Sequence, residues 1–175
     1  MPGIDEALFF QPLSFAVLSI SHTRSFDDDG SGDCLAGCIE DAGHTLRARR
    51  LVKDEISTIS TQVKNWSEDK KIDVILTTGG TGLTCRDVTV DAIAPMFDKT
   101  LDGFSVLFHK MSFETIGLAT LQSRACAGLL GGTFVFCLPG STGAVKQAWD
   151  EIIGGALDSR YRPSSLVDLM PRLME

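Results

Sequence analysis

A loop of glycines in the middle of the chain, followed closely by an acid, has the composition of a phosphate-binding site. The loop contains Gly79, Gly80, Thr81 and Gly82. It follows residues 72–76, an apolar run typical of a buried strand, and leads into a predicted helix. Backbone N–H groups at such a junction, with the positive end of the helix, bind phosphate or carboxylate. The glycines alone also fit a tight connection without a ligand, but Arg86 and Asp87 favour the anion site.

A second strand–loop–helix junction follows the apolar residues 133–138. It contains Pro139, Gly140 and Ser141. In an open parallel sheet both junctions lie at the carboxyl edge, where ligands bind. Two anion sites on one edge predict a ligand with two anionic parts, or two phosphorylated ligands side by side. An ordinary helix cap is an equally good interpretation of this second junction.

Two acids have the same position relative to their strands, because Asp54 and Asp87 each follow a predicted strand and precede a predicted helix. Such positions meet at one edge of a parallel sheet. Mg²⁺ keeps several waters and needs only one or two carboxylates, so this pair could hold it beside phosphates. That arrangement performs phosphoryl or nucleotidyl transfer. The competing interpretation makes Asp54 a helix N-cap and Asp87 a partner of Arg86 only.

The remaining polar candidates give weaker signals. The histidines fit no zinc-binding spacing; they are His22, His44 and His109. Cys85 lies near the glycine loop without an obvious base beside it, and Arg124 reaches either the ligand edge or a surface acid. The acidic run at residues 27–29 is typical of a solvated loop.

The elements that must position these residues alternate between strand and helix. Predicted strands cover residues 15–20, 45–52, 74–77, 126–130 and 133–138. Predicted helices cover residues 32–42, 53–66, 103–111 and 144–157, with a short one near residue 90 that Pro95 limits. Gly131 and Gly132 join the last two strands as a hairpin. Alternation of this kind predicts an α/β fold with a mainly parallel sheet.

Length and composition predict one domain in residues 1–175, with a core at about 15–157, an arm at 1–13 and a tail at 158–175. The net charge of −7 disfavours a nucleic-acid partner. No apolar run approaches the roughly 20 residues that span a bilayer. The five scattered cysteines and the absence of a basic signal-peptide start predict a cytoplasmic protein.

Two segments resemble the signatures of a known family. Residues 78–82 with 86–89 resemble the first signature of the MoaB/MogA family of molybdenum cofactor biosynthesis proteins, and residues 138–141 resemble the second. Residues 28–32, 111–114 and 121–124 place the closer match in the MoaB branch. The resemblance runs from about residue 15 to residue 157.

The resemblance implies a three-layer α/β/α molybdopterin-binding fold that assembles as a trimer or as a hexamer of two trimers. It implies binding of molybdopterin, and catalytic members of the family use Mg-ATP to adenylylate the phosphate of this ligand. It also implies contact with other proteins of the molybdenum cofactor pathway. GTP is a possible second nucleotide. By position, Asp54 and Asp87 match the catalytic acids that hold Mg²⁺. The glycine loop matches the nucleotide-binding residues, and the molybdopterin-binding positions are Ser21, Pro139, Gly140 and Ser141.

Two departures leave the enzymatic step open. Catalytic relatives usually have Ser-Asp after the first strand, where this chain has Ser21 followed by His22. Their second signature usually continues as Pro-Gly-Asn-Pro or Pro-Gly-Gln-Pro, where this chain has Ser141 and Thr142 after the glycine. The alternative is a catalytically silent member that binds molybdopterin or a nucleotide.

Overall fold

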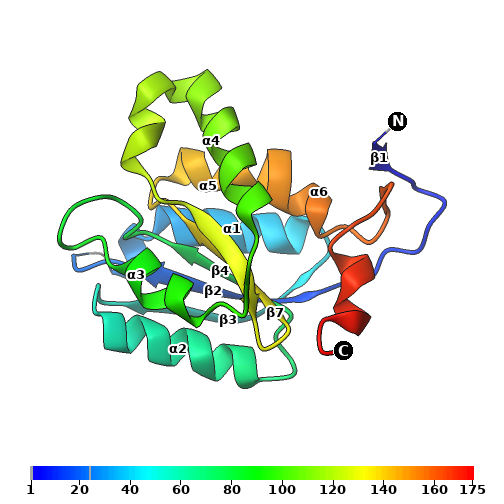
Figure 1. The fold of residues 1–175 in the computed structure, drawn as a ribbon, viewed down its shortest axis with the longest axis horizontal. Helices are drawn as coiled ribbons and strands as arrows, with labels where there is room; N and C mark the ends of the chain where they lie inside the picture. The colour runs from blue at the N-terminus through cyan, green and yellow to red at the C-terminus, as the bar shows by residue number, and fades with distance from the viewer. Residues whose placement is uncertain (1, 24) are drawn as a thin grey trace.

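A six-stranded sheet lies between two layers of helices in the computed structural model, which describes residues 2–23 and 25–175 (Figure 1). The strand order is β3-β2-β4-β7-β6-β5. The parallel strands are β2 (Ser14–Ile20), β3 (Thr45–Val52), β4 (Val74–Thr78) and β7 (Thr133–Leu138). The antiparallel strands are β5 (Lys99–Thr100) and β6 (Cys126–Leu130). The predicted α/β fold with a mainly parallel sheet is confirmed.

The central strands are apolar on both faces because helices cover both sides of the sheet. Every residue of β4 is buried, and so are six of the seven residues of β2. Alternate residues of β2 enter different cores: Phe15 and Val17 face one helical layer, and Ala16 and Leu18 face the other. The sheet is thereby fixed between two hydrophobic cores.

Helices from different parts of the chain make up each layer. One face of the sheet is covered by α1 (Gly30–Asp41), α4 (Asp102–Ile116), α5 (Thr142–Ala148) and α6 (Gly154–Ala156), and the other by α2 (Ile56–Glu68) and α3 (Thr89–Ile93) (Figure 1). A π-helical turn, Trp149–Ile153, joins α5 to α6. Short 3₁₀ turns are η1 (Phe26–Asp28), η2 (Ala94–Met96), η3 (Gly117–Gln122) and η5 (Val167–Arg172). No helix in the described ranges is long and apolar enough to cross a membrane.

The interpretation of Asp54 as a helix N-cap is wrong. Helix α2 begins at Ile56, and the residue at its N-cap is Glu55, whose side chain makes no capping hydrogen bond. The carboxylate of Asp54 instead lies 3.1 Å from Nδ1 of His22, measured from Oδ1. The partner comes from the loop after β2, so spacing along the sequence gave no sign of it.

The prediction of a solvated loop at residues 27–29 is correct for the first two acids and wrong for Asp29. Asp27 and Asp28 are exposed, whereas Asp29 is 0% exposed. Its carboxylate accepts hydrogen bonds from the backbone N–H of Gly32 at 3.1 Å, where it caps α1, and from Oγ of Ser19 at 2.6 Å. An ion pair with Arg49 on β3 compensates its burial.

The N-terminal arm pairs with the start of the C-terminal tail. Strand β1 (Gly3–Ile4) pairs antiparallel with β8 (Tyr161–Arg162), and Figure 1 shows both termini at the same side of the sheet. The ring of Phe10 lies 5.1 Å from the ring of His44 and 5.0 Å from the guanidinium of Arg160. The arm and the tail therefore both pack around His44.

His44 makes stability depend on pH. Its Nδ1 accepts a hydrogen bond from the backbone N–H of Leu13 at 3.1 Å, so the ring is neutral, and burial lowers its pKa while nearby Asp158 opposes that shift. As pH falls through 6.5, the ordinary pKa of histidine, His44 of the unfolded chain binds a proton, whereas His44 of the folded chain stays neutral. We therefore expect the free energy of unfolding to decrease over that window, measured by urea denaturation between about pH 7.5 and 5.5.

His44→Gln should reduce the pH slope, because the substitution removes the ring that the folded chain keeps neutral. An unfolding free energy in the wild type that stays constant over the window would contradict the role of His44.

Candidate functional site

The two predicted loops lie side by side at the carboxyl edge of the sheet, because β4 and β7 are neighbours. The backbone N–H of Gly79 donates to the carbonyl of Leu138 at 3.0 Å. Oγ1 of Thr78 donates to the carbonyl of Pro139 at 2.9 Å. The ends of the two strands are thus tied together, and the loops that follow them border a common space.

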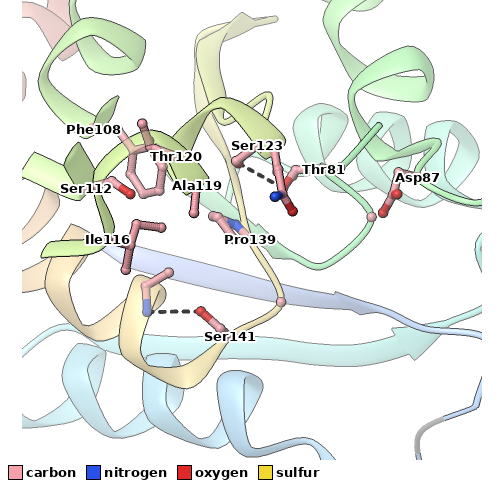
Figure 2. Close-up of a pocket in the computed structure, with 15 residues that line it drawn as sticks. Thr81, Asp87, Phe108, Ser112, Ile116, Ala119, Thr120, Ser123, Pro139 and Ser141 are labelled. Atoms are coloured by element: carbon pink, nitrogen blue, oxygen red, sulfur yellow. Dashed lines mark hydrogen bonds between the residues drawn. The ribbon is translucent and has the colours of Figure 1, made fainter. Parts of the chain in front are cut away.

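That space is a cavity of about 260 Å³. The loops after β4 and β7, with the first turn of α5, contribute Gly80, Thr81, Gly82, Asp87, Pro139, Gly140, Ser141 and Ala144. Helix α4 and η3, with the residue that follows η3, contribute Phe108, Ser112, Ile116, Ala119, Thr120, Gln122 and Ser123. Figure 2 shows Pro139 and Ser141 on one side and Asp87 on the other, with Thr81 and Ser123 between them. One cavity therefore connects both predicted anion sites.

The glycine loop combines closely packed glycines with backbone amides that have no acceptor among the described residues. Gly79 has φ +100°, and a Cβ there would lie 2.3 Å from the carbonyl oxygen of Ile20. A Cβ on Gly80 would lie 2.3 Å from Oγ1 of Thr89. No described residue accepts a hydrogen bond from the backbone amides of Gly80 and Thr81. Packing explains the glycines at 79 and 80, and the two amides remain able to bind an anion.

The carboxylate of Asp87 is held in the loop and stays ionised. Its Oδ2 accepts from Oγ1 of Thr84 at 2.6 Å and from the backbone N–H of Thr84 at 2.9 Å. These bonds, a bond from the Gly82 backbone and the charge of Arg124 lower the pKa of Asp87, although partial burial opposes them. Within the described chain Asp87 forms no ion pair with Arg86, so the interpretation of Asp87 as a partner of Arg86 is wrong.

Arg124 fixes the loop from outside the cavity. Its Nε donates to the carbonyl of Gly82 at 2.9 Å and its Nη2 to the carbonyl of Asp87 at 2.5 Å. Both guanidinium nitrogens Nη1 and Nη2 bond the carboxylate of Asp91 at 2.9 Å. Both predicted alternatives hold, because Arg124 reaches the site and also pairs with a surface acid.

The second loop is both a helix cap and part of the cavity wall. Oγ of Ser141 accepts the backbone N–H of Ala144 at 3.2 Å and so caps α5. Pro139, Gly140 and Ser141 all line the cavity. The two interpretations of this junction are therefore compatible.

Three of the predicted site residues do not line the cavity. Gly79 packs behind it, and Ser21 and Asp54 follow β2 and β3, further along the same sheet edge. The backbone N–H of Ser21 donates to the carbonyl of Val52 at 3.0 Å. Asp54 and Asp87 thus share the carboxyl edge but follow strands that have β2 between them, and only Asp87 faces the cavity.

The wall formed by α4 and η3 was not predicted as part of the site. Oγ of Ser123 lies 3.3 Å from Oγ1 of Thr81, and Oγ1 of Thr120 lies 2.9 Å from Nδ1 of His109. Ser112, Gln122 and Ser123 fall in residues 111–114 and 121–124, which carry the resemblance to the MoaB branch. That resemblance was the only available signal, because hydroxyl and amide side chains on a helix have no diagnostic spacing.

The site offers Mg²⁺ one ionised carboxylate. Nowhere in residues 2–23 and 25–175 do three or more His, Cys, Asp or Glu side chains gather in a way that could hold a metal ion. Mg²⁺ bound to a nucleotide needs only one or two carboxylates, because phosphates and waters supply the other ligands. The ionised carboxylate of Asp87, at the border of the cavity, fits that requirement.

Known sequences resemble this chain over most of its length. A family model described as a probable molybdopterin binding domain matches residues 16–159. The molybdenum cofactor biosynthesis protein B of Escherichia coli K12 is 43% identical over 154 residues, which cover 88% of this chain and 91% of that protein. The protein of the same name from Staphylococcus aureus strain COL is 45% identical over 146 residues, covering 79% of this chain and 83% of the relative.

Solved structures agree with these sequence matches. A crystal structure of molybdenum cofactor biosynthesis protein B superposes with a TM-score of 0.79 at 38% identity, over 82% of this chain and 89% of that one. The tungsten cofactor synthesizing protein MoaB from Pyrococcus furiosus superposes with a TM-score of 0.71 at 33% identity, over 82% of this chain and 92% of that one.

Proposed function

The chain belongs to the family of molybdenum cofactor biosynthesis proteins with a molybdopterin-binding domain, as its motifs predict, and we propose that it adenylylates molybdopterin. In the proposed reaction the terminal phosphate of molybdopterin attacks the α-phosphorus of ATP, and pyrophosphate leaves. Molybdopterin binds against Pro139, Gly140 and Ser141, with Ser21 further along the same edge. The nucleotide phosphates bind at the glycine loop.

The observation that carries this proposal is the single cavity bordered by both loops. A phosphate bound at the amides of Gly80 and Thr81 lies in the same space as a ligand bound at Ser141. Donors fixed before the reaction stabilise the charge that develops on the α-phosphate without reorganising. No side chain is needed as a general base, since the attacking phosphate is already anionic.

The acids are proposed to act on the nucleotide through Mg²⁺, which neutralises phosphate charge when bound. Asp87 is the nearer ligand, because it is ionised and lines the cavity. Asp54 would approach from the side of β3, where its Oδ1 is already bonded to His22. A GTP complex would use the same amides and the same acid, because these groups contact phosphates and not the base.

The experiment that tests the proposal follows pyrophosphate release from Mg-ATP by the purified protein, with and without molybdopterin. Release that requires molybdopterin supports the adenylyltransferase. Binding of molybdopterin in calorimetry without pyrophosphate release would instead support a catalytically silent binding protein, which His22 and the pair Ser141 and Thr142 favour. Equal binding of ATP or GTP whether or not molybdopterin is present would support a nucleotide-binding scaffold.

Self-association is proposed from the exposed apolar surface of α4 and η3, which project away from the sheet (Figure 1). The exposed side chains are Val106, Leu107, Phe113, Ile116, Leu118 and Leu121. Apolar side chains gathered in this way mark an interface in soluble proteins. A trimer, or a hexamer of two trimers, would cover them.

We expect light scattering to give the mass of a trimer or hexamer, and the double variant Leu118→Glu, Leu121→Glu to weaken association about a hundredfold or more. Burying one leucine stabilises by about 1.5 to 3 kcal/mol, and the variant loses two such contributions. Ile56→Glu is the control, because Ile56 is also an exposed apolar residue but lies on α2. A monomeric wild-type mass would contradict self-association.

A further inference from the structure

Two cysteines lie directly opposite each other on neighbouring strands, and the proposed function uses neither of them. Cys126 on β6 and Cys137 on β7 are partners in the antiparallel register. Cys137 is fully buried, whereas Cys126 is partly exposed. Both pack in the core under α2 and α3, on the face of the sheet away from α4. The surface proposed for self-association therefore leaves access to Cys126 unchanged.

We propose that Cys126 and Cys137 form a site for thiol–disulfide exchange with a low-molecular-weight disulfide, which ends as an intrachain Cys126–Cys137 disulfide. Directly opposite residues of an antiparallel pair have Cα atoms about 4.5 to 5.5 Å apart. A disulfide joins residues whose Cα atoms are about 4.4 to 6.8 Å apart. The sheet thus holds the two residues at a separation that the bond can bridge.

The surroundings make Cys126 the attacking residue. A hydrogen bond from the thiol of Cys137 and the positive charge of Arg124 lower the pKa of Cys126, against the effect of burial. The same hydrogen bond and complete burial raise the pKa of Cys137. Because the thiolate is the nucleophile, the partly exposed Cys126 reacts first and Cys137 follows.

The exchange proceeds in two steps. The Cys126 thiolate attacks one sulfur of the disulfide RSSR, forms a mixed disulfide with one R–S group and releases the other as a thiolate. Cys137 then loses its proton to that thiolate, and its sulfur attacks the Cys126 sulfur and releases the second R–S group. The two cysteines give up two electrons and two protons, and RSSR becomes two RSH.

Cys34 and Cys38 provide a matched pair within the same molecule. They also comprise one partly exposed and one buried thiol, but they lie four residues apart on α1. Cβ atoms at that helical spacing are about 5 to 6 Å apart, whereas a disulfide requires about 3.5 to 4.5 Å. We expect this pair to remain reduced under conditions that oxidise the strand pair.

The test incubates the full chain with oxidised glutathione, stops exchange with acid, alkylates free thiols and maps tryptic peptides by mass spectrometry. Trypsin places Cys126 and Cys137 together in peptide 125–146, and Cys34 and Cys38 together in peptide 25–47. We expect peptide 125–146 to lose the mass of two hydrogens about ten times more readily than peptide 25–47. Equal loss in both peptides, or no loss in peptide 125–146, would overturn the proposal.

Two variants separate the steps. In Cys137→Ser the glutathione stays on Cys126, because the second thiol is missing. In Cys126→Ser the buried Cys137 remains unmodified, and glutathione on Cys137 in that variant would refute the assigned order. The peptide map of the wild type tests the proposal even if neither variant folds. None of these measurements depends on molybdopterin or ATP.

Discussion

Asp87→Asn is expected to lower molybdopterin-dependent pyrophosphate release about a hundredfold while leaving the fold intact. The substitution removes the only ionised carboxylate that lines the cavity in the described part of the chain. Losing one preorganised charge or donor at a reacting phosphate costs about a hundredfold to a thousandfold in rate. The amide oxygen of asparagine still accepts a hydrogen bond from Thr84, so the loop keeps its shape. The measurement is the initial rate of release at saturating Mg-ATP.

Asp41→Asn is the control, because Asp41 is also an aspartate but is the exposed last residue of α1 and does not line the cavity. Its rate should equal that of the wild type. Equal rates for both variants would remove Asp87 from the mechanism. Unfolding midpoints of the two variants should agree, since a shift confined to Asp87→Asn would point to loop collapse and not to lost charge.

The pH dependence of the same assay gives a second check on Asp87. Hydrogen bonds from Thr84 and the charge of Arg124 hold its pKa below the ordinary 3.8. The carboxylate therefore remains ionised between about pH 7 and 5, so titration of Asp87 contributes no loss of rate in that range. An inflection in the wild type that is absent in Asp87→Asn would place the pKa of Asp87 in that range and contradict this account.

The parts of the fold that were predictable are those specified by neighbouring residues. The short apolar runs of β2 and β4 identify buried strands, and Gly131 with Gly132 identifies the β6–β7 hairpin. The π-helical turn at Trp149–Ile153 has no such local pattern. It interrupts a helix whose apolar spacing continues through it.

The candidate site also has a part that was predictable from neighbouring residues and a part that was not. The glycine loop and Asp87 are close in sequence, so their common role was predictable. The bond between Asp54 and His22 joins residues 32 positions apart, and the wall of α4 and η3 meets the glycine loop only in the folded chain. Contacts of this kind depend on strand order, which the strand and helix pattern alone does not fix.

The role of Asp29 also depends on a contact that the sequence pattern does not show, and its substitution has the largest expected effect on stability. Three adjacent acids look alike in the sequence, yet only Asp29 turns inward to meet Arg49. Its Oδ2 lies 2.7 Å from Nη2 of Arg49, and the side chain of Arg49 is only 21% exposed. Nε of Arg49 is buried without a partner in the described structure. Removing Asp29 would therefore leave a largely buried cation with only the exposed Asp33 to pair with it.

Asp29→Ala is expected to reduce the free energy of unfolding by about 3 kcal/mol, at the low end of the range for breaking a buried ion pair. The same change removes the N-cap of α1 and the acceptor for Ser19. For a chain of this length the loss corresponds to a fall of roughly 6 to 12 °C in Tm.

Differential scanning calorimetry measures this change, and Asp28→Ala is the matched control, one residue away. Asp28 is exposed, and among the described residues its carboxylate accepts a bond from Oγ of Ser25 at 3.1 Å. Its replacement should change the unfolding free energy by no more than about 0.5 kcal/mol. Similar Tm values for the two variants would show that the pair with Arg49 contributes little. A large difference would show that Asp29, through its cap on α1 and its ion pair with Arg49, holds α1 in place against β3.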